Sequence, residues 1–509
     1  MGEVKKEEKI DRRKYIKYIG TGAALAVAAA IGYGVSELTR PPPPKPTTVV
    51  TTITTLMPTP TPTLPVKKKT IKYTNIFNVQ SEGARIFSTL MTEKFNARSP
   101  THEIDMSLNS YTYIVDPILL GEIKAGTHPL FVDSVDHYNG QYIVMDAVVP
   151  LDEFLDKYPE IKRDNWILSI EEKTFKPYEE KYGFKYWCLP FGTTYESFFF
   201  VRTDLLKEAG YTMDDVNRIK SIDDIREIGK ALTKPEKGIW GFELCGTRWD
   251  ITDTIWPQWA IAQDKKLGNW LSEDWSESYV NQWPWVEAMK AHIDFVYNSK
   301  ISSPASIKEG DEVVTELLMS GKVAMTQTEF VNIGVIMDRD RTLAKTKQPQ
   351  FLKSGTIQFA PGPDMGSGIR GWLAPYGFIM LKRPEATKED YEAVFEYMAS
   401  WLTQESQMEI QKLTGLFPAS ISAADTLLKK SKELMEKGDY SLQCINAMWP
   451  LIKDTLIPAP PFPAFVAMVY DIQATWGEKA WLREIPVQEA MDNAAKEINE
   501  LCKKFGYRK

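Results

Sequence analysis

Two hydrophobic periods alternate along residues 71–505. Residues 71–77 alternate polar and apolar positions and then become apolar, which predicts a strand. From Glu82 the apolar residues recur with a 3.6-residue period, which predicts a helix capped by Ser81. The same reasoning predicts further strands at residues 130–132 and 323–326, and helices from Ser221, over residues 313–319 and over residues 487–505. Strands that alternate with helices indicate an α/β fold with mostly parallel sheets.

Polar residues at the ends of these strands are candidate ligand contacts, because ligands of parallel sheets bind beyond the carboxyl ends of the strands. The expected positions are the loops after Phe77, Val132 and Met325. Asp133 and Asp136 end the second of these strands, and we expect one of them to contact a ligand while the other caps the chain.

The first 66 residues have a different pattern from the rest of the chain. Residues 1–18 are basic, with seven lysines and arginines against four acids, and residues 19–35 carry no charge. Residues 36–66 form a stalk that is rich in proline and threonine and cannot bury a core. By the positive-inside rule, the basic segment is cytoplasmic, residues 19–35 are a signal or membrane anchor, and the remainder is extracellular.

Two questions about this leader stay open in the sequence. Arg12 and Arg13, followed by Lys14, resemble a twin-arginine export signal, although Asp11 departs from it; the alternative is an ordinary charged signal segment. The apolar run spans about 25 Å as a helix, so it serves equally as a cleaved signal or as an anchor. We favour an uncleaved anchor on the extracellular face of the membrane, because a stalk is useful only when its near end is fixed. The alternative is secretion after cleavage.

Composition excludes several functions for the remaining residues. The net charge is −7 and the sequence has no basic stripe, so nucleic acid is not an expected partner. The four cysteines and four histidines lack the spacing of a metal site, and no cofactor is expected. One or two disulfides outside the cell remain open.

Five short segments are informative as a set: LGEIKAGT at 120–127, PLDEF at 150–154, WCLPFGTTY at 187–195, SGKVAM at 320–325 and TGLFP at 414–418. Together they resemble the extracellular solute-binding proteins of ABC importers, in the group that includes the maltose-binding protein. Each match is short, but their order and spacing over residues 71–505 are specific as a set.

The resemblance implies a two-lobed periplasmic-binding-protein fold of type II, with a solute cleft between lobes joined by hinge strands. It places the amino-terminal lobe at residues 67–190 and 361–417, and the carboxy-terminal lobe at residues 191–360 and 418–509. The crossings fall near residues 189–195, 357–362 and 417–420. Such proteins deliver a solute to ABC permease subunits and are not enzymes.

The resemblance and the side-chain chemistry together imply a sugar or oligosaccharide ligand. Fifteen tryptophans are many for this length, and flat aromatic rings pack against the apolar face of a sugar. Single tryptophans are more often core residues, except at Trp372, which follows Gly371 in an expected glycine-rich turn. Glu82 opens a helix, where an acid is favoured by the helix dipole alone. The candidate ligand-binding residues are Glu82, Asp133, Asp136, Tyr195, Glu196, Trp249, Trp256, Glu329, Phe330 and Trp372.

The sequence also departs from the family. Phe330 lies one position earlier than the aromatic residue that many members have after the Gly-Lys segment, and Arg202-Thr203 replaces the usual Tyr-Asn. Two other classes compete with a binding protein. A secreted carbohydrate-active enzyme needs a pair of catalytic carboxylates, which no motif marks here. A surface adhesin is suggested by the stalk alone.

Overall fold

The computed structural model divides the chain into two units, residues 1–66 and residues 67–509. The structure describes residues 67–77, 81–174, 179, 182–195, 198–247, 255–329 and 332–508. The predicted basic segment, anchor and stalk therefore lie outside the described residues. Within the described ranges, no helix has the length and hydropathy needed to cross a membrane.

The first of two sheets has seven strands in the order β2-β1-β3-β8-β4-β9, with β10 paired to β8. Strand β1 runs parallel to β2 and β3, whereas β8 runs antiparallel to β3 and β4. The strands are β1 (Lys69–Asn75), β2 (His102–Leu108), β3 (Phe131–Val135), β4 (Leu189–Tyr195), β8 (Gly371–Met380), β9 (Phe417–Pro418) and β10 (Leu456–Pro458). We call this sheet and the helices packed on it the first lobe.

The second sheet has the order β6-β5-β7, with β5 at Phe198–Arg202, β6 at Met325–Thr328 and β7 at Ile357–Pro361. Both of its strand pairs are antiparallel, so the expectation of mostly parallel sheets is wrong here and holds only in part of the first sheet. The reason is that β5 follows directly after β4 and β7 leads back into β8, so these strands enter and leave the sheet in opposite directions. This sheet and its helices are the second lobe.

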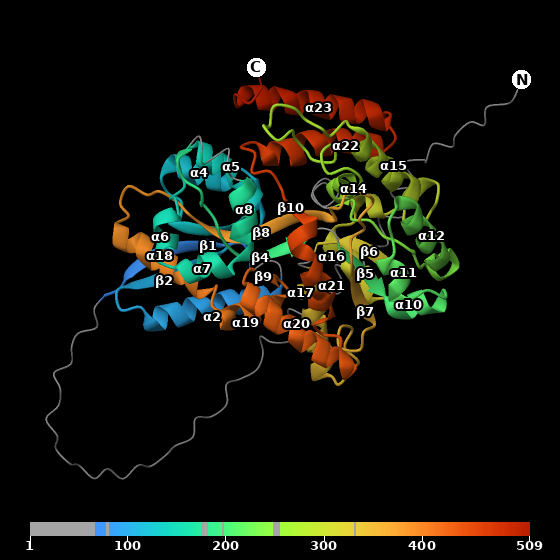
Figure 1. Cartoon of the computed structure of the whole chain (residues 1–509), viewed down its shortest axis with the longest axis horizontal. Helices are drawn as coiled ribbons and strands as arrows, with labels where there is room; N and C mark the ends of the chain where they lie inside the picture. The colour runs from blue at the N-terminus through green and yellow to red at the C-terminus, as the bar shows by residue number, and fades with distance from the viewer. Residues whose placement is uncertain are drawn as a thin grey trace, which may run out of the picture. The chain divides into compact units, whose positions relative to one another are not determined.

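Helices cover both sheets (Figure 1). Those of the first lobe are α2 (Glu82–Arg98), α3 (Thr112–Val115), α4 (Ile118–Ala125), α5 (Gly140–Val144), α6 (Asp152–Asp156), α7 (Pro159–Asp164), α8 (Trp166–Thr174), α18 (Lys388–Ser400) and α19 (Gln404–Thr414). Those of the second are α10 (Thr203–Glu208), α11 (Met213–Asn217), α12 (Ile222–Leu232), α14 (Trp256–Gln263), α15 (Trp283–Tyr297), α16 (Asp311–Met319), α17 (Asn332–Lys345), α21 (Gln443–Thr455), α22 (Ala474–Trp481) and α23 (Val487–Lys504). Helix α20 (Ile421–Glu436) packs on both α19 and α21.

The predicted helix starts are confirmed by their caps. The Ser81 hydroxyl accepts a hydrogen bond from the Ala84 backbone N–H, and the Ser221 hydroxyl accepts one from Asp224, which satisfies donors that the first helical turn leaves free. The periodic apolar residues of α12 and α23 are largely buried, as the 3.6-residue pattern requires.

Two strands near the predicted crossings are fastened by one buried amide, the side chain of Gln407 in α19. Its Oε1 accepts hydrogen bonds from the backbone N–H groups of Ala419 (2.7 Å) and Ser420 (3.2 Å). Its Nε2 donates to the carbonyl oxygens of Phe191 in β4 (2.8 Å) and Trp401 (2.9 Å). All of its hydrogen-bonding capacity is therefore used, and it ties β4 and Trp401 to the segment that follows β9.

Candidate functional site

A layer of aromatic side chains lies where the two lobes meet. We define this aromatic layer as His137, Tyr138 and Trp372 from the first lobe with Trp270, Phe465 and Tyr470 from the second. The ring centroids of Trp270 and Trp372 are 4.4 Å apart, and Phe465 lies 5.3 Å from Trp270 and 4.6 Å from His137. Tyr138 and Tyr470 are joined through their hydroxyl groups. Every member is buried.

Trp372 is held in this layer by its backbone and by its ring. It is the second residue of β8. The prediction of a glycine-rich turn at Gly371 is therefore wrong, because Gly371 begins the strand and pairs with β10. The Trp372 backbone N–H donates to Oε1 of Gln258 in α14, at 2.7 Å. The side chain is only 1% exposed.

Three donors in and beside the layer have no partner among the described residues. They are the indole Nε1 groups of Trp270 and Trp372 and the amide Nε2 of Gln258, all of them buried. A buried polar group without a partner costs about 1–3 kcal/mol. Because all three are donors, the groups that would satisfy them are acceptors, such as the oxygens of water or of a hydroxyl-rich ligand.

An acidic residue of the second lobe approaches a tyrosine of the first lobe near this layer. Burial raises the pKa of Tyr111 well above its usual range, and nearby Tyr138, Tyr376 and Glu329 raise it further. Glu329 follows β6 and is half-buried. The predicted contact Glu329 therefore lies where residues of both lobes come together.

The two predicted aspartates bind groups of their own lobe. Asp133 is fully buried and accepts hydrogen bonds from the Tyr73 hydroxyl (2.9 Å) and from the Phe77 backbone N–H (2.7 Å), which shapes the chain after β1. Asp136 accepts from Nε1 of Trp187 at 3.0 Å. Burial raises the pKa of each carboxyl to about 7. Asp136 precedes the layer residues His137 and Tyr138 in the chain, and its carboxylate is engaged by Trp187.

Glu82 and Trp256 lie apart from the aromatic layer. Glu82 is exposed and pairs with Arg85, while its backbone N–H donates to Asp338 of α17 at 2.8 Å. Trp256 is buried in the second lobe, with its ring centroid 6.0 Å from His292 and 6.2 Å from Trp481.

Four predicted contacts are not characterised by the structure. Tyr195 ends β4, opposite Leu373 of β8, but its side chain is not described. Glu196, Trp249 and Phe330 lie outside the described residues.

Sequence reasoning did not select Gln258, nor the layer residues His137, Tyr138, Trp270, Phe465 and Tyr470. The proline-rich segment before Phe465 was the available signal, since it breaks the helical pattern and starts the π-helix Ala467–Gln473.

A family model for bacterial extracellular solute-binding proteins matches residues 91–437. The chain belongs to this family. The resemblance inferred from the short segments is thereby confirmed, and so is the two-lobed α/β fold, through solved structures that match it over most of its length.

Three of these structures illustrate the similarity. A Thermotoga lettingae ABC transporter solute-binding protein with bound α-D-tagatose is 16% identical, with a TM-score of 0.64 over 85% of this chain and 100% of its own. MalE3 of T. maritima with bound maltose is 17% identical, with a TM-score of 0.65 over 85% and 99%. A maltose/maltodextrin-binding domain from Bdellovibrio bacteriovorus with maltotriose is 16% identical, with a TM-score of 0.62 over 85% and 100%. At this identity the likeness establishes the fold.

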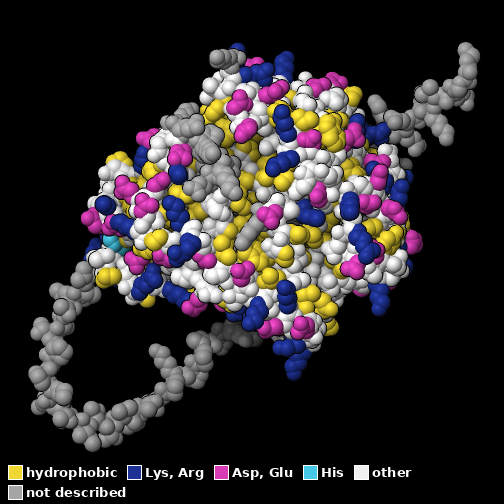
Figure 2. Space-filling model, viewed as in Figure 1, with side chains coloured by type: hydrophobic (Ala, Val, Ile, Leu, Met, Phe, Trp, Pro, Cys, Tyr) yellow, Lys and Arg dark blue, Asp and Glu magenta, His cyan; other side chains and the backbone are white. Residues whose placement is uncertain are grey.

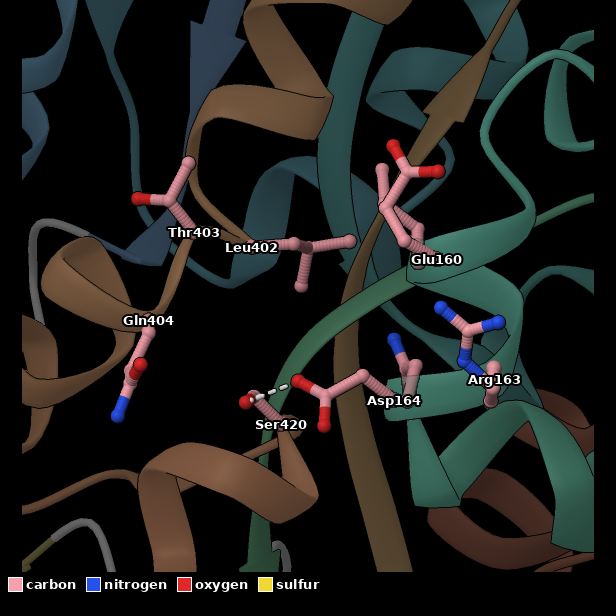
Figure 3. A pocket seen from close by; sticks show the side chains of 9 residues that line it. Glu160, Arg163, Asp164, Leu402, Thr403, Gln404 and Ser420 are labelled. Carbon is pink, nitrogen blue, oxygen red and sulfur yellow. Dashed lines mark hydrogen bonds between the residues drawn. The ribbon is translucent and has the colours of Figure 1, made fainter. Parts of the chain in front are cut away.

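The solute-binding protein also has a surface pocket of about 360 Å³ on its first lobe (Figure 3). Glu160, Arg163 and Asp164 of α7 face the residues that begin α19 across this pocket. Asp164 is already engaged, because it accepts hydrogen bonds from the Ser420 hydroxyl and from Ser422. The pocket contains no aromatic side chain. It therefore lacks the flat apolar surface that a sugar ring requires, and the aromatic layer is the better candidate site.

The remaining surface of the solute-binding protein favours neither a metal nor a polyanion. Among the described residues, no group of three or more histidines, cysteines, aspartates or glutamates is placed to hold a metal ion. Figure 2 shows basic and acidic side chains interspersed over the face in view.

Proposed function

We propose that this solute-binding protein binds a sugar or oligosaccharide at the aromatic layer between its lobes and delivers it to the permease of an ABC importer. The observation that supports this proposal is the layer itself, where buried aromatic rings lie beside three hydrogen-bond donors that have no partner among the described residues. The named ligands of similar structures support the sugar class, since they are tagatose, maltose and maltotriose.

The chemistry of the layer suits a sugar better than a peptide or an ion. A pyranose ring has an apolar face of C–H groups that packs on an indole ring, and a rim of hydroxyl oxygens that accept hydrogen bonds. Trp270 and Trp372 supply indole rings, and the free donors of these rings and of Gln258 supply partners for the rim. No reaction on the solute is involved in this function, so the solute leaves unchanged.

The unit outside the described residues completes this proposal. Residues 19–35 anchor the protein after export, by the twin-arginine route or the general one, and residues 36–66 hold the binding unit away from the membrane. The lobes have the boundaries that the family resemblance implies: residues 67–190 with 361–417, and residues 191–360 with 418–509. This arrangement keeps the binding unit at the extracellular face, near its permease.

A thermal-shift screen of the full-length protein against sugars, polyols and short peptides tests the proposal. A ligand that binds only the folded state stabilises it by about 2.7 kcal/mol at a hundredfold excess over its Kd, so the correct sugar raises the Tm. Chromatography of the recovered sugar should show no product. Stabilisation by peptides alone, or a cleaved sugar, contradicts the proposal.

A further inference from the structure

A second pocket, of about 420 Å³, lies on the second lobe between α12 and α15. Its walls include Arg226 of α12, Gln263 of α14 and Glu287 of α15, together with Met365 from the segment that joins β7 to β8. None of the aromatic-layer residues lines it, so it is separate from the site described above.

The unusual residue of this pocket is Trp283, the first residue of α15, whose side chain is 50% exposed. Its neighbour Trp285 is buried and donates its Nε1–H to the Asn269 carbonyl oxygen, so the two tryptophans have opposite environments. The other large apolar residues that are exposed in the described ranges are all aliphatic and lie on other elements: Ile86, Leu108, Ile118, Met145, Val313 and Leu482. Trp283 is thus a single exposed indole in a concave site, not part of a broad apolar patch for protein docking.

The charges around Trp283 largely neutralise one another. Arg226 donates to Asp294 at 2.8 Å and is also paired with Asp223, and Lys290 is paired with Glu287 at 2.8 Å. With Lys220, three basic residues face three acidic ones in the lining. A pocket lined by paired charges offers many hydrogen-bond donors and acceptors but has no net charge. Such a lining favours a neutral polyhydroxyl ligand over an anion or a cation.

We propose that this pocket is an accessory saccharide site, in which a pyranose ring stacks on Trp283 and its hydroxyls bond to the charged walls. This inference goes beyond the function proposed above, because that function needs only the layer between the lobes. The Met365 backbone N–H donates to the Ala262 carbonyl oxygen of α14 at 3.1 Å. A saccharide in the pocket therefore also contacts the segment that links the second lobe to β8 of the first.

Oxidation of tryptophan by N-bromosuccinimide tests the site on the full-length protein, because exposed indoles react first. Peptide mass spectrometry gives the oxidation rate at Trp283 with maltose, cellobiose or xylobiose, and with glycerol as an osmotic control. When a disaccharide exceeds its Kd tenfold, only the unliganded fraction reacts, so the rate should fall about tenfold. The same protection should appear in Gln258→Leu, which alters the other site.

The outcomes separate this inference from the proposed function. A sugar that raises the Tm without slowing oxidation at Trp283 overturns the accessory site and leaves the proposed function standing. Protection that weakens in Gln258→Leu also overturns it, because the effect then comes from the aromatic layer. Protection at Trp283 by a sugar whose affinity is unchanged in Gln258→Leu supports the accessory site and contradicts binding of that sugar at the aromatic layer.

Discussion

Replacing Gln258 with leucine tests whether the aromatic layer binds the solute. The substitution removes the buried Nε2 donor that has no partner among the described residues, and it also removes the acceptor for the Trp372 backbone N–H. A neutral hydrogen bond contributes about 1 kcal/mol, which is about a fivefold change in Kd. The Trp372 N–H then has no partner, which costs about 1–3 kcal/mol, and removal of the unsatisfied Nε2 offsets part of this cost. We therefore expect the free energy of unfolding to fall by less than about 3 kcal/mol.

Gln411 in α19 offers a matched control. It is also fully buried, and neither its Oε1 nor its Nε2 has a partner among the described residues. Gln411→Leu therefore removes an unsatisfied amide without breaking a hydrogen bond, and stability should stay the same or rise. Since Gln411 belongs to the first lobe and is not in the layer, affinity should not change.

Calorimetric titration with the solute found by screening gives the Kd of each variant. Chemical denaturation of the free proteins gives the free energy of unfolding. The expected pattern is a loss of both affinity and stability for Gln258→Leu, and of neither for Gln411→Leu. Equal affinity in the two variants and the unmodified protein refutes the assignment of Gln258 to the solute site, whatever happens to stability.

Four further predictions address the aromatic layer, the fastening of β4 by Gln407, a buried histidine and the stalk. Trp372→Ala should lower the free energy of unfolding by about 3–5 kcal/mol and weaken solute binding about thirtyfold; unchanged affinity excludes stacking. Gln407→Leu leaves four buried backbone groups without a partner, so its loss of stability in urea should exceed about 3 kcal/mol, and a smaller loss contradicts the fastening role. Burial lowers the pKa of His292 well below its ordinary value of 6.5, so protons bind mainly to the unfolded state as the pH falls below 6.5. The free energy of unfolding should therefore decline below pH 6.5 by up to about 1.4 kcal/mol per pH unit more than in His292→Leu. Parallel pH profiles for the two proteins contradict this prediction. Proteolysis within residues 41–65 should release the binding unit from membranes, whereas mature protein in the medium that begins near residue 29 contradicts anchoring.

The elements that sequence reasoning located best are those whose signals are local. Ser81 and Ser221 both cap helices, as their positions just before the periodic apolar residues indicated, because a cap bonds to a backbone group only three residues away. Strand direction was harder to predict. Whether β5 and β7 pair parallel or antiparallel depends on where the chain leaves one sheet for the other, and this is not encoded in the pattern of either strand.

The candidate site was predicted only in part because its residues come together from distant segments. Asp133 and Asp136 were identified from their position after a strand, yet their carboxylates are occupied by Tyr73, Phe77 and Trp187, which no local pattern reveals. Trp270, Trp372 and Phe465 meet from three separate parts of the chain. A periodic pattern can show that each is apolar or buried, but it cannot show which residue each ring contacts.

Burial of the aromatic layer has a consequence for how a solute reaches it. Contacts such as Trp270 with Trp372, and Glu82 with Asp338, join the lobes directly. A sugar can enter only when these contacts separate, so we infer that the lobes move apart to admit it. Gln407 fixes β4 to the segment after β9 on the first-lobe side. The motion is therefore expected to fall beyond these fastened strands, toward the second lobe, where the chain passes from β4 to β5 and from β7 to β8.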